Sequence, residues 1–167
     1  MRDISIPEAA KLVAEQIVNP GAFLCSSDGE HQNVMTIGWG GVNNFYQFGC
    51  FITAVRKSRY TYELLRRNGS FTVSVPLHDM RKEIGFAGTK SGRDVNKFDG
   101  HGLTAAPAQH VNVPIVKECE LQIECEPFGF MELKPENLPA DVLERWYPDR
   151  DMHWYFLGKI VKCYRLD

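Results

Sequence analysis

The chain has 167 residues, which fits one domain and allows roughly 70% of the unfolded surface to be buried, so folding requires neither a metal nor a disulfide. A net charge of -2 leaves no basic surplus for binding a nucleic acid or for polybasic attachment to a membrane. No apolar run reaches the roughly 20 residues of a membrane span, and the N-terminus lacks a signal-peptide core, so we expect a cytoplasmic protein.

The first predicted element is a helix over Ala9–Ile17. Ser5 is a suitable N-cap, Pro7 fits the first turn, and the run Asn19-Pro20-Gly21 ends the helix. The following sequence consists of short apolar runs separated by turn residues, a pattern typical of strands. The predicted strands are Ala22–Ser26, Val34–Trp39, Phe48–Val55, Phe71–Val75, Leu121–Leu133 and Trp154–Leu166.

Three further helices are predicted among these strands, at Arg59–Asn68, at Asp79–Ala87 and at Ala140–Trp146. The last of them lies within the polar segment Lys134–Arg150, which either covers a functional site or lies on a dimer surface. Many strands with few inserted helices, and no regular alternation of strand and helix, indicate a mainly β (α+β) fold such as a barrel. We expect a single domain over residues 1–167.

Two segments have the composition of phosphate-binding sites. The first begins with three residues at the end of a predicted strand and continues into a basic turn. It comprises Thr53, Ala54, Val55, Arg56, Lys57, Ser58, Arg59, Tyr60 and Thr61. Ser58 is the predicted cap of the next helix. Free amides at a helix start, the positive end of its dipole and adjacent guanidinium groups suit a dianionic phosphate. A solvated basic turn accounts for the same residues.

The second segment runs from Gly88 to Phe98 and combines glycines and hydroxyls with three cations. These residues are Gly88, Thr89, Lys90, Ser91, Gly92, Arg93, Asp94, Val95, Asn96, Lys97 and Phe98. Glycines let backbone amides approach an anion closely, and the cations supply charge. The order of residues differs from that of a P-loop, which argues against nucleotide hydrolysis. A flexible charged surface loop is the alternative.

A third segment forms a strand that could lie along the edge of a flat ring. It comprises Asn33, Val34, Met35, Thr36, Ile37, Gly38 and Trp39. A strand glycine permits close approach of another group, and Thr36 offers a small polar side chain. Met35 and Trp39 could equally belong to the core.

Together these segments resemble the flavin reductase-like (flavoredoxin) family of FMN-binding split β-barrels. The resemblance covers about Asn19 to Val161 and rests on the order and spacing of several short stretches. They are Asn33–Thr36, Ser58–Leu64, Ser91–Phe98, Gly102-Leu103-Thr104, Glu118-Cys119, and His153 five residues before Gly158.

The resemblance implies a homodimer in which each FMN lies at or near the interface. It assigns the phosphate to Ser58, Arg59 and the loop Ser91–Lys97, and the ring and ribityl chain to two strands. The implied cofactor-binding residues are Asn33, Met35, Thr36, Ile37, Gly38, Trp39, Thr53, Ala54, Val55, Arg56, Ser58, Arg59, Tyr60, Thr61, Ser91, Gly92, Asp94 and Lys97.

His153 is the candidate catalytic residue, because the matching histidine of the family lies near the flavin. Relatives commonly have an aspartate directly before it, whereas here Met152 takes that position and Asp151 precedes Met152. A rim histidine without a chemical function is the alternative. The other histidines lack metal-ligand spacing, so no metal is expected. The five cysteines form no CxxC pair and are expected to be buried, reduced thiols.

The activity implied is hydride transfer from NADH or NADPH to bound FMN, followed by electron transfer to free flavin, ferric iron, oxygen or a partner protein. The chain has no GxGxxG fingerprint, so the nicotinamide is expected to stack on the flavin. The alternatives are a flavoredoxin-type electron carrier, which exchanges electrons with a partner protein, and a flavin-binding module without turnover. The expected partners are therefore flavin and nicotinamide nucleotides and a redox protein, and not nucleic acid or membrane.

Overall fold

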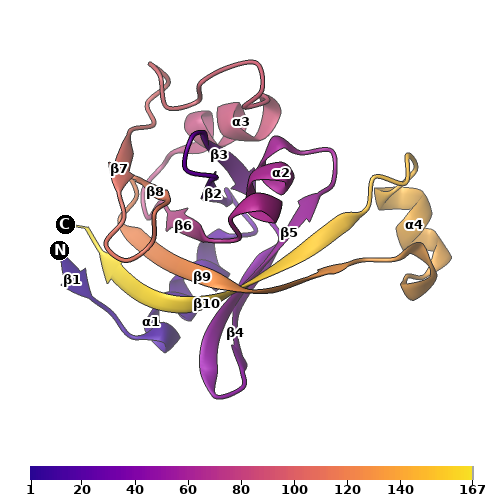
Figure 1. The fold of residues 1–167 in the computed structure, drawn as a ribbon, viewed down its shortest axis with the longest axis horizontal. Coiled ribbons are helices and arrows are strands. Elements are labelled where there is room, and N and C mark those ends of the chain that lie inside the picture. The colour runs from indigo at the N-terminus through magenta and orange to yellow at the C-terminus, as the bar shows by residue number, and fades with distance from the viewer. Residues whose placement is uncertain (167) are drawn as a thin grey trace.

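A computed structural model describes residues 1–166; Asp167, the last residue of the predicted domain, lies outside the described residues. Most of the molecule is β structure (Figure 1). The helices are α1 (Ile6–Gln16), α2 (Tyr60–Arg67), α3 (Arg81–Thr89) and α4 (Ala140–Trp146), with a 3-10 turn at Pro135–Asn137. The strands are β1 (Arg2–Asp3), β2 (Ala22–Ser27), β3 (Gln32–Ile37), β4 (Gly40–Phe45), β5 (Phe48–Arg56), β6 (Phe71–Val75), β7 (Ala105–Pro107), β8 (Pro114–Val116), β9 (Leu121–Glu132) and β10 (His153–Arg165).

One antiparallel sheet organises the molecule, with the strand order β3-β2-β6-β9-β10-β5-β4 and β1 paired to β10. The small β7–β8 ribbon forms a second sheet. The mainly β fold and the helices predicted from the sequence are confirmed, with boundaries shifted by a few residues. The start of α1 follows the predicted cap, because the Ser5 hydroxyl accepts a hydrogen bond from the Glu8 amide at 3.3 Å.

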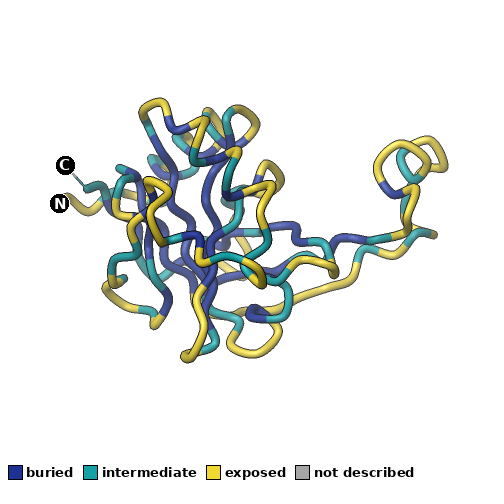
Figure 2. The backbone as a smooth tube through the Cα atoms, turned by 90° about the horizontal axis from the view of Figure 1, so that it is seen from above, coloured by how far each residue is buried: buried dark blue, intermediate teal, exposed yellow. Residues whose placement is uncertain are grey.

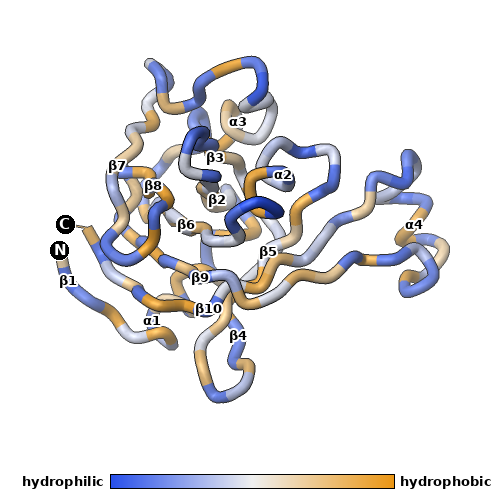
Figure 3. The backbone as a smooth tube through the Cα atoms, in the orientation of Figure 1, coloured by the Kyte–Doolittle hydropathy of each residue, from blue (hydrophilic) through white to orange (hydrophobic). Residues whose placement is uncertain are grey.

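The barrel interior is apolar. The strands β2 and β6 are buried along their whole length, whereas the edge strand β4 has no buried residue (Figure 2). Inward-facing residues of β9 such as Leu121, Ile123 and Cys125 join the main core and alternate with Gln122 and Glu124. The chain around α4, far from this core, carries several strongly hydrophilic stretches (Figure 3). A second apolar cluster lies under α3 and the β8 region and includes Phe23 and Val34. Strand β2 is therefore covered on both faces, because Leu24 belongs to the main core and its neighbours Phe23 and Cys25 belong to the second cluster.

Beyond the barrel, β9 and β10 continue as a two-stranded arm that ends in α4 (Figure 1). The first five residues of β9 are buried and the rest are exposed, so the change from core to arm falls after Cys125. Register shifts at Leu157/Gly158 and Ile160/Lys162 bend β10 at the exit from the barrel. A Cβ on Gly158 would lie 2.6 Å from the Phe71 ring, so only glycine permits this close approach.

The sequence prediction missed four strands, β1, β4, β7 and β8. The longest of them is β4, an edge strand of sequence Gly-Gly-Val-Asn-Asn-Phe that pairs with β5. Glycine and asparagine are uncommon in strands, so the segment reads as a turn. The segment Asn44–Gly49 contains the tip of the β4–β5 hairpin. There Tyr46 and Gln47 have φ of 47° and 67°, which is the backbone that a tight hairpin turn requires.

All five cysteines are free and buried, as predicted. Within residues 1–166, histidines, cysteines and carboxylates form no group of three or more that could hold a metal ion. Helices that are both long and apolar enough to cross a membrane are also absent from these residues.

Candidate functional site

A cavity of about 360 Å³ lies where β3, the end of β5, the start of α2 and the turn after α3 meet. Most of the residues predicted from the sequence as cofactor-binding line it, although they come from segments far apart in the chain. They are Asn33, Met35, Thr36, Ile37, Gly38, Trp39, Ala54, Arg56, Ser58, Arg59, Tyr60, Thr61, Ser91, Gly92 and Lys97, together with His153. A hydrogen bond from the Thr36 hydroxyl to the Ile84 carbonyl, at 2.5 Å, holds β3 against α3 beside the cavity.

Three predicted cofactor residues do not line this cavity. Thr53 and Val55 alternate along β5 with Ala54 and Arg56, so their side chains are buried on the core side of the strand. Asp94 is exposed, and its amide closes a turn onto the Ser91 carbonyl at 3.1 Å. The sequence segments were assigned as continuous blocks, but strand alternation and the turn direct these three side chains elsewhere.

The start of α2 supplies the hydrogen-bond donors at one end of the cavity. Among residues 1–166, neither the Tyr60 amide nor the Thr61 amide donates to another residue, so both stay available at the positive end of the helix. The Thr61 hydroxyl accepts a hydrogen bond from the Asn33 side chain at 2.8 Å, which fixes Asn33 beside these amides. This arrangement provides backbone donors for an anion without a P-loop.

Ser58 does not cap α2, contrary to the sequence prediction. The N-cap is Arg59, whose side chain makes no capping hydrogen bond. The Ser58 amide and hydroxyl instead donate to the carboxylate of Asp151, at 3.1 and 2.5 Å. Asp151 follows α4, so these bonds attach the returning end of the arm to the loop before α2.

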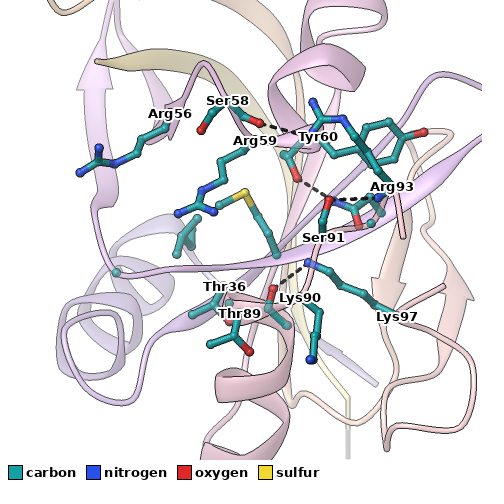
Figure 4. A pocket seen from close by; sticks show the side chains of 18 of the residues that line it. Thr36, Arg56, Ser58, Arg59, Tyr60, Thr89, Lys90, Ser91, Arg93 and Lys97 are labelled. Carbon is teal, nitrogen blue, oxygen red and sulfur yellow. Dashed lines mark hydrogen bonds between the residues drawn. The ribbon is translucent and has the colours of Figure 1, made fainter. Parts of the chain in front are cut away.

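Two cations, Lys97 and Arg59, approach the cavity from different segments (Figure 4). The Lys97 ammonium group is buried and donates to the Ala87 carbonyl at 2.7 Å. Burial, and then the nearby charge of Arg59, lower the pKa of Lys97 to about 8. Neither Lys97 nor Arg59 has an acidic partner among the described residues, so an anion between them would relieve their repulsion.

Arg93, by contrast, is already paired. Its guanidinium donates to the Ser58 carbonyl at 3.1 Å, forms an ion pair with Glu63 and lies 5.4 Å from the centre of the Tyr60 ring. It therefore fastens the loop after α3 to α2. In the same loop, a Cβ on Gly92 would lie 2.1 Å from the Asn33 Oδ1, so this close packing requires glycine.

The other end of the cavity is aromatic. The Trp39 ring lies 4.6 Å from the His153 ring, and Trp146 from the end of α4 packs edge-on against Trp39 at 5.6 Å. Burial, followed by the charge of Arg56, lowers the pKa of His153 to about 4, so the imidazole is neutral at pH 7. The His153 Nδ1 is 2.8 Å from the hydroxyl of the buried Tyr147.

Several residues of the cavity and its walls were absent from the predicted site. Lining residues outside that set are Ala87, Gly88, Thr89, Lys90 and Arg93. The charge and glycine content of the loop after α3 was the signal that could have included most of them. Tyr147 and Asp151 had no such signal, because their contacts to the site depend on how the arm returns to β5.

The family of the chain follows from comparison with known proteins. A family model described as the flavin reductase like domain matches residues 15–167. The chain belongs to the flavin reductase-like family. The family predicted from the sequence is thereby confirmed, and the split-barrel fold of its structural neighbours agrees with the sheet described above.

Individual relatives extend this comparison. An uncharacterised protein of Archaeoglobus fulgidus is 37% identical over 103 residues, which are 62% of this chain and only 58% of that relative. The flavoredoxin of Desulfovibrio vulgaris (Miyazaki F) is 25% identical with a TM-score of 0.69, covering 89% of this chain and 70% of its own. The flavoredoxin from Methanosarcina acetivorans is 26% identical with a TM-score of 0.70, covering 89% and 69%.

Proposed function

We propose that the chain binds FMN in this cavity and is an oxidoreductase that transfers hydride from NADH or NADPH to the bound flavin. The electrons then pass to an acceptor such as free flavin, ferric iron, oxygen or a partner protein. One observation carries the proposal: a single cavity has cations at one end, beside backbone amides that donate to none of the described residues, and aromatic rings at the other end. A phosphorylated ring compound has the same two-ended chemistry.

The donors around the start of α2 fit a phosphate dianion. The amides of Tyr60 and Thr61 and the cations of Arg59 and Lys97 offer backbone and charge-assisted hydrogen bonds. Charge-assisted bonds contribute about 1.5–3 kcal/mol each, and a micromolar dissociation constant corresponds to about 8 kcal/mol. A few such bonds therefore supply much of the required affinity.

The wall at the other end fits a planar ring. Ala54, Gly38 and Met35 offer small or apolar surface along two strands, and Trp39 and His153 offer flat faces. When bound, FMN supplies the hydride and electron chemistry, and the protein supplies position and electrostatics. Trp39 is 42% exposed and Trp146 is 44% exposed, so a second planar group such as a nicotinamide can reach the same end from solvent.

An anaerobic titration tests this function. Purified protein is loaded with FMN, and the visible flavin band is followed after addition of NADH or NADPH in the absence of oxygen. Rapid bleaching by either nucleotide supports the reductase. Bleaching only by a reduced partner protein would replace the reductase with an electron carrier, and failure to take up FMN would refute the flavin site itself.

We further propose a cytoplasmic homodimer. The five free thiols agree with a reducing compartment. The arm exposes apolar side chains that a second copy would cover, since isolated proteins rarely expose contiguous apolar surface. These are Phe128, Phe130, Met131 and Trp146, which are between 41% and 54% exposed. Light scattering on the purified protein measures the mass, and a monomer at micromolar concentration would refute the dimer.

A further inference from the structure

Tyr147 is the buried residue that directly follows α4. No residue of α4 itself is buried, whereas Tyr147 is 2% exposed, with its hydroxyl 2.8 Å from the His153 Nδ1. The arm thus brings Tyr147, in addition to Trp146, back to the ring end of the cavity. The two residues are six positions apart, on the two sides of the turn that leads into β10.

Arg56 holds this part of the chain in place. Its guanidinium donates to the Trp146 carbonyl at 2.7 Å and to the Asp151 carbonyl at 3.1 Å, and it lies 5.1 Å from the centre of the Tyr147 ring. Ser58 holds Asp151 from the same loop. The position of the tyrosine hydroxyl is therefore set by contacts on both sides of it.

The proton between the two residues has one arrangement that satisfies both. Burial raises the pKa of the Tyr147 phenol and lowers the pKa of His153, so both groups are neutral at pH 7. Within residues 1–166, the only side-chain partner of the phenol is Nδ1. If Nδ1 carried the imidazole proton, the phenol would have to accept, and its own proton would remain buried without an acceptor.

The imidazole proton is then on Nε2. The Nε2 atom makes no hydrogen bond to the described residues. It is not among the fully buried polar atoms that lack a partner, and His153 lines the cavity, so Nε2 is accessible there. A neutral histidine has one donor and one acceptor nitrogen, and the hydrogen bond at one of them fixes the other.

We propose that Tyr147 is a positioning residue that fixes His153 as the Nε2–H tautomer, so that the ring end presents an N–H donor to an acceptor atom of the bound flavin or substrate. This inference rests on the proposed function for the identity of the ligand. The ligand atom that fits is a carbonyl oxygen or an unprotonated ring nitrogen, and a group that only donates does not fit.

The test is the tautomer itself, measured in protein labelled with 15N-histidine by long-range 1H–15N correlation at pH 7. The His153 signals are assigned by their loss in His153→Gln. In the wild type we expect an unprotonated Nδ1 and a protonated Nε2. In Tyr147→Phe we expect both nitrogens to move toward averaged shifts, as in a mixture of tautomers.

Tyr62→Phe is the matched control, because it removes a phenol from a ring that packs on Trp154 and does not contact His153. It should leave the His153 signals unchanged. A protonated Nδ1 in the wild type overturns the proposal even if Tyr147→Phe fails to fold, and an unchanged tautomer in folded Tyr147→Phe overturns the positioning by Tyr147. Measurement without FMN separates this result from failure of the proposed function, which FMN titration reports on its own.

Discussion

Replacing Lys97 by methionine tests the phosphate end of the cavity most directly. Methionine keeps an unbranched, flexible side chain but has no ammonium group. In the wild type this group is buried, donates to the Ala87 carbonyl and has no carboxylate partner among the described residues. A charge-assisted hydrogen bond contributes about 1.5–3 kcal/mol, and about 1.4 kcal/mol corresponds to tenfold in affinity. We therefore expect the dissociation constant of FMN to rise by about 10- to 150-fold.

Riboflavin, which has the same ring but no phosphate, should lose little affinity in Lys97→Met. Both ligands are titrated by quenching of flavin fluorescence at pH 7. Lys82→Met is the matched control, because Lys82 is exposed on α3 and does not line the cavity. Equal losses for FMN and riboflavin would refute the assignment of the phosphate to this end.

The lowered pKa of Lys97 adds a dependence on pH. A bound phosphate favours the ammonium form, so FMN binding above pH 8 takes up a proton and its affinity should fall as the pH rises through about 8. In the absence of ligand, the stability of the folded protein changes with pH in the direction opposite to the FMN affinity. The unfolded chain keeps the Lys97 proton to about pH 10.4, so unfolding of the apo protein should become harder between about pH 8 and that value. Calorimetry of the apo protein should accordingly show a Tm that rises between about pH 8 and about pH 10 in the wild type, with a smaller rise in Lys97→Met.

Three other perturbations test the remaining contacts. Gly92→Ala places a Cβ 2.1 Å from the Asn33 side chain and should weaken FMN binding. Gly85→Ala places a Cβ with no atom within 4 Å and should leave FMN binding unchanged. Titration of both variants with FMN measures the difference. Arg56→Met removes two hydrogen bonds to the chain that returns from α4, so amide hydrogen exchange there should accelerate while α1 stays unchanged. The pKa of His153 is about 4 in the folded protein and about 6.5 in the unfolded chain, so the free energy of unfolding should decrease as the pH falls through this interval. In His153→Gln the free energy of unfolding should depend less on pH, which urea titrations measure.

Six of the ten strands and the four α-helices were predictable because turn residues separate them clearly. The predicted helix stop Asn19-Pro20-Gly21 falls between two observed elements, and so do the turn-forming pairs Asp28-Gly29 and Asn68-Gly69. β4 escaped prediction because its glycines and asparagines oppose strand propensity, and only pairing with β5 makes it a strand. Here the tertiary contact decides the conformation, which no local pattern could indicate.

The sequence predicted which segments form the candidate site but not which of their side chains point into it. Three segments with cations, glycines and small polar residues do meet around one cavity. Which groups remain unpaired there depends on distant partners. Glu63 forms an ion pair with Arg93, and Asp151, which is 93 positions from Ser58, accepts hydrogen bonds from the Ser58 amide and hydroxyl. Of the cations that line the cavity, Arg56 and Arg93 have acidic partners, whereas Arg59, Lys90 and Lys97 form no ion pair among residues 1–166.

The six residues from Arg56 to Thr61 consequently serve two separate structural purposes. Arg56 and Ser58 direct their donors at the chain that returns from α4, which sets the position of Tyr147 and the histidine beside it. The Tyr60 and Thr61 amides remain unpaired at the start of α2, beside the cavity. Because the two sets of donors have different partners, substitutions in them should have separable effects. Loss of Arg56 should alter the ring end with little change in the discrimination between FMN and riboflavin, and loss of Arg59 should do the reverse.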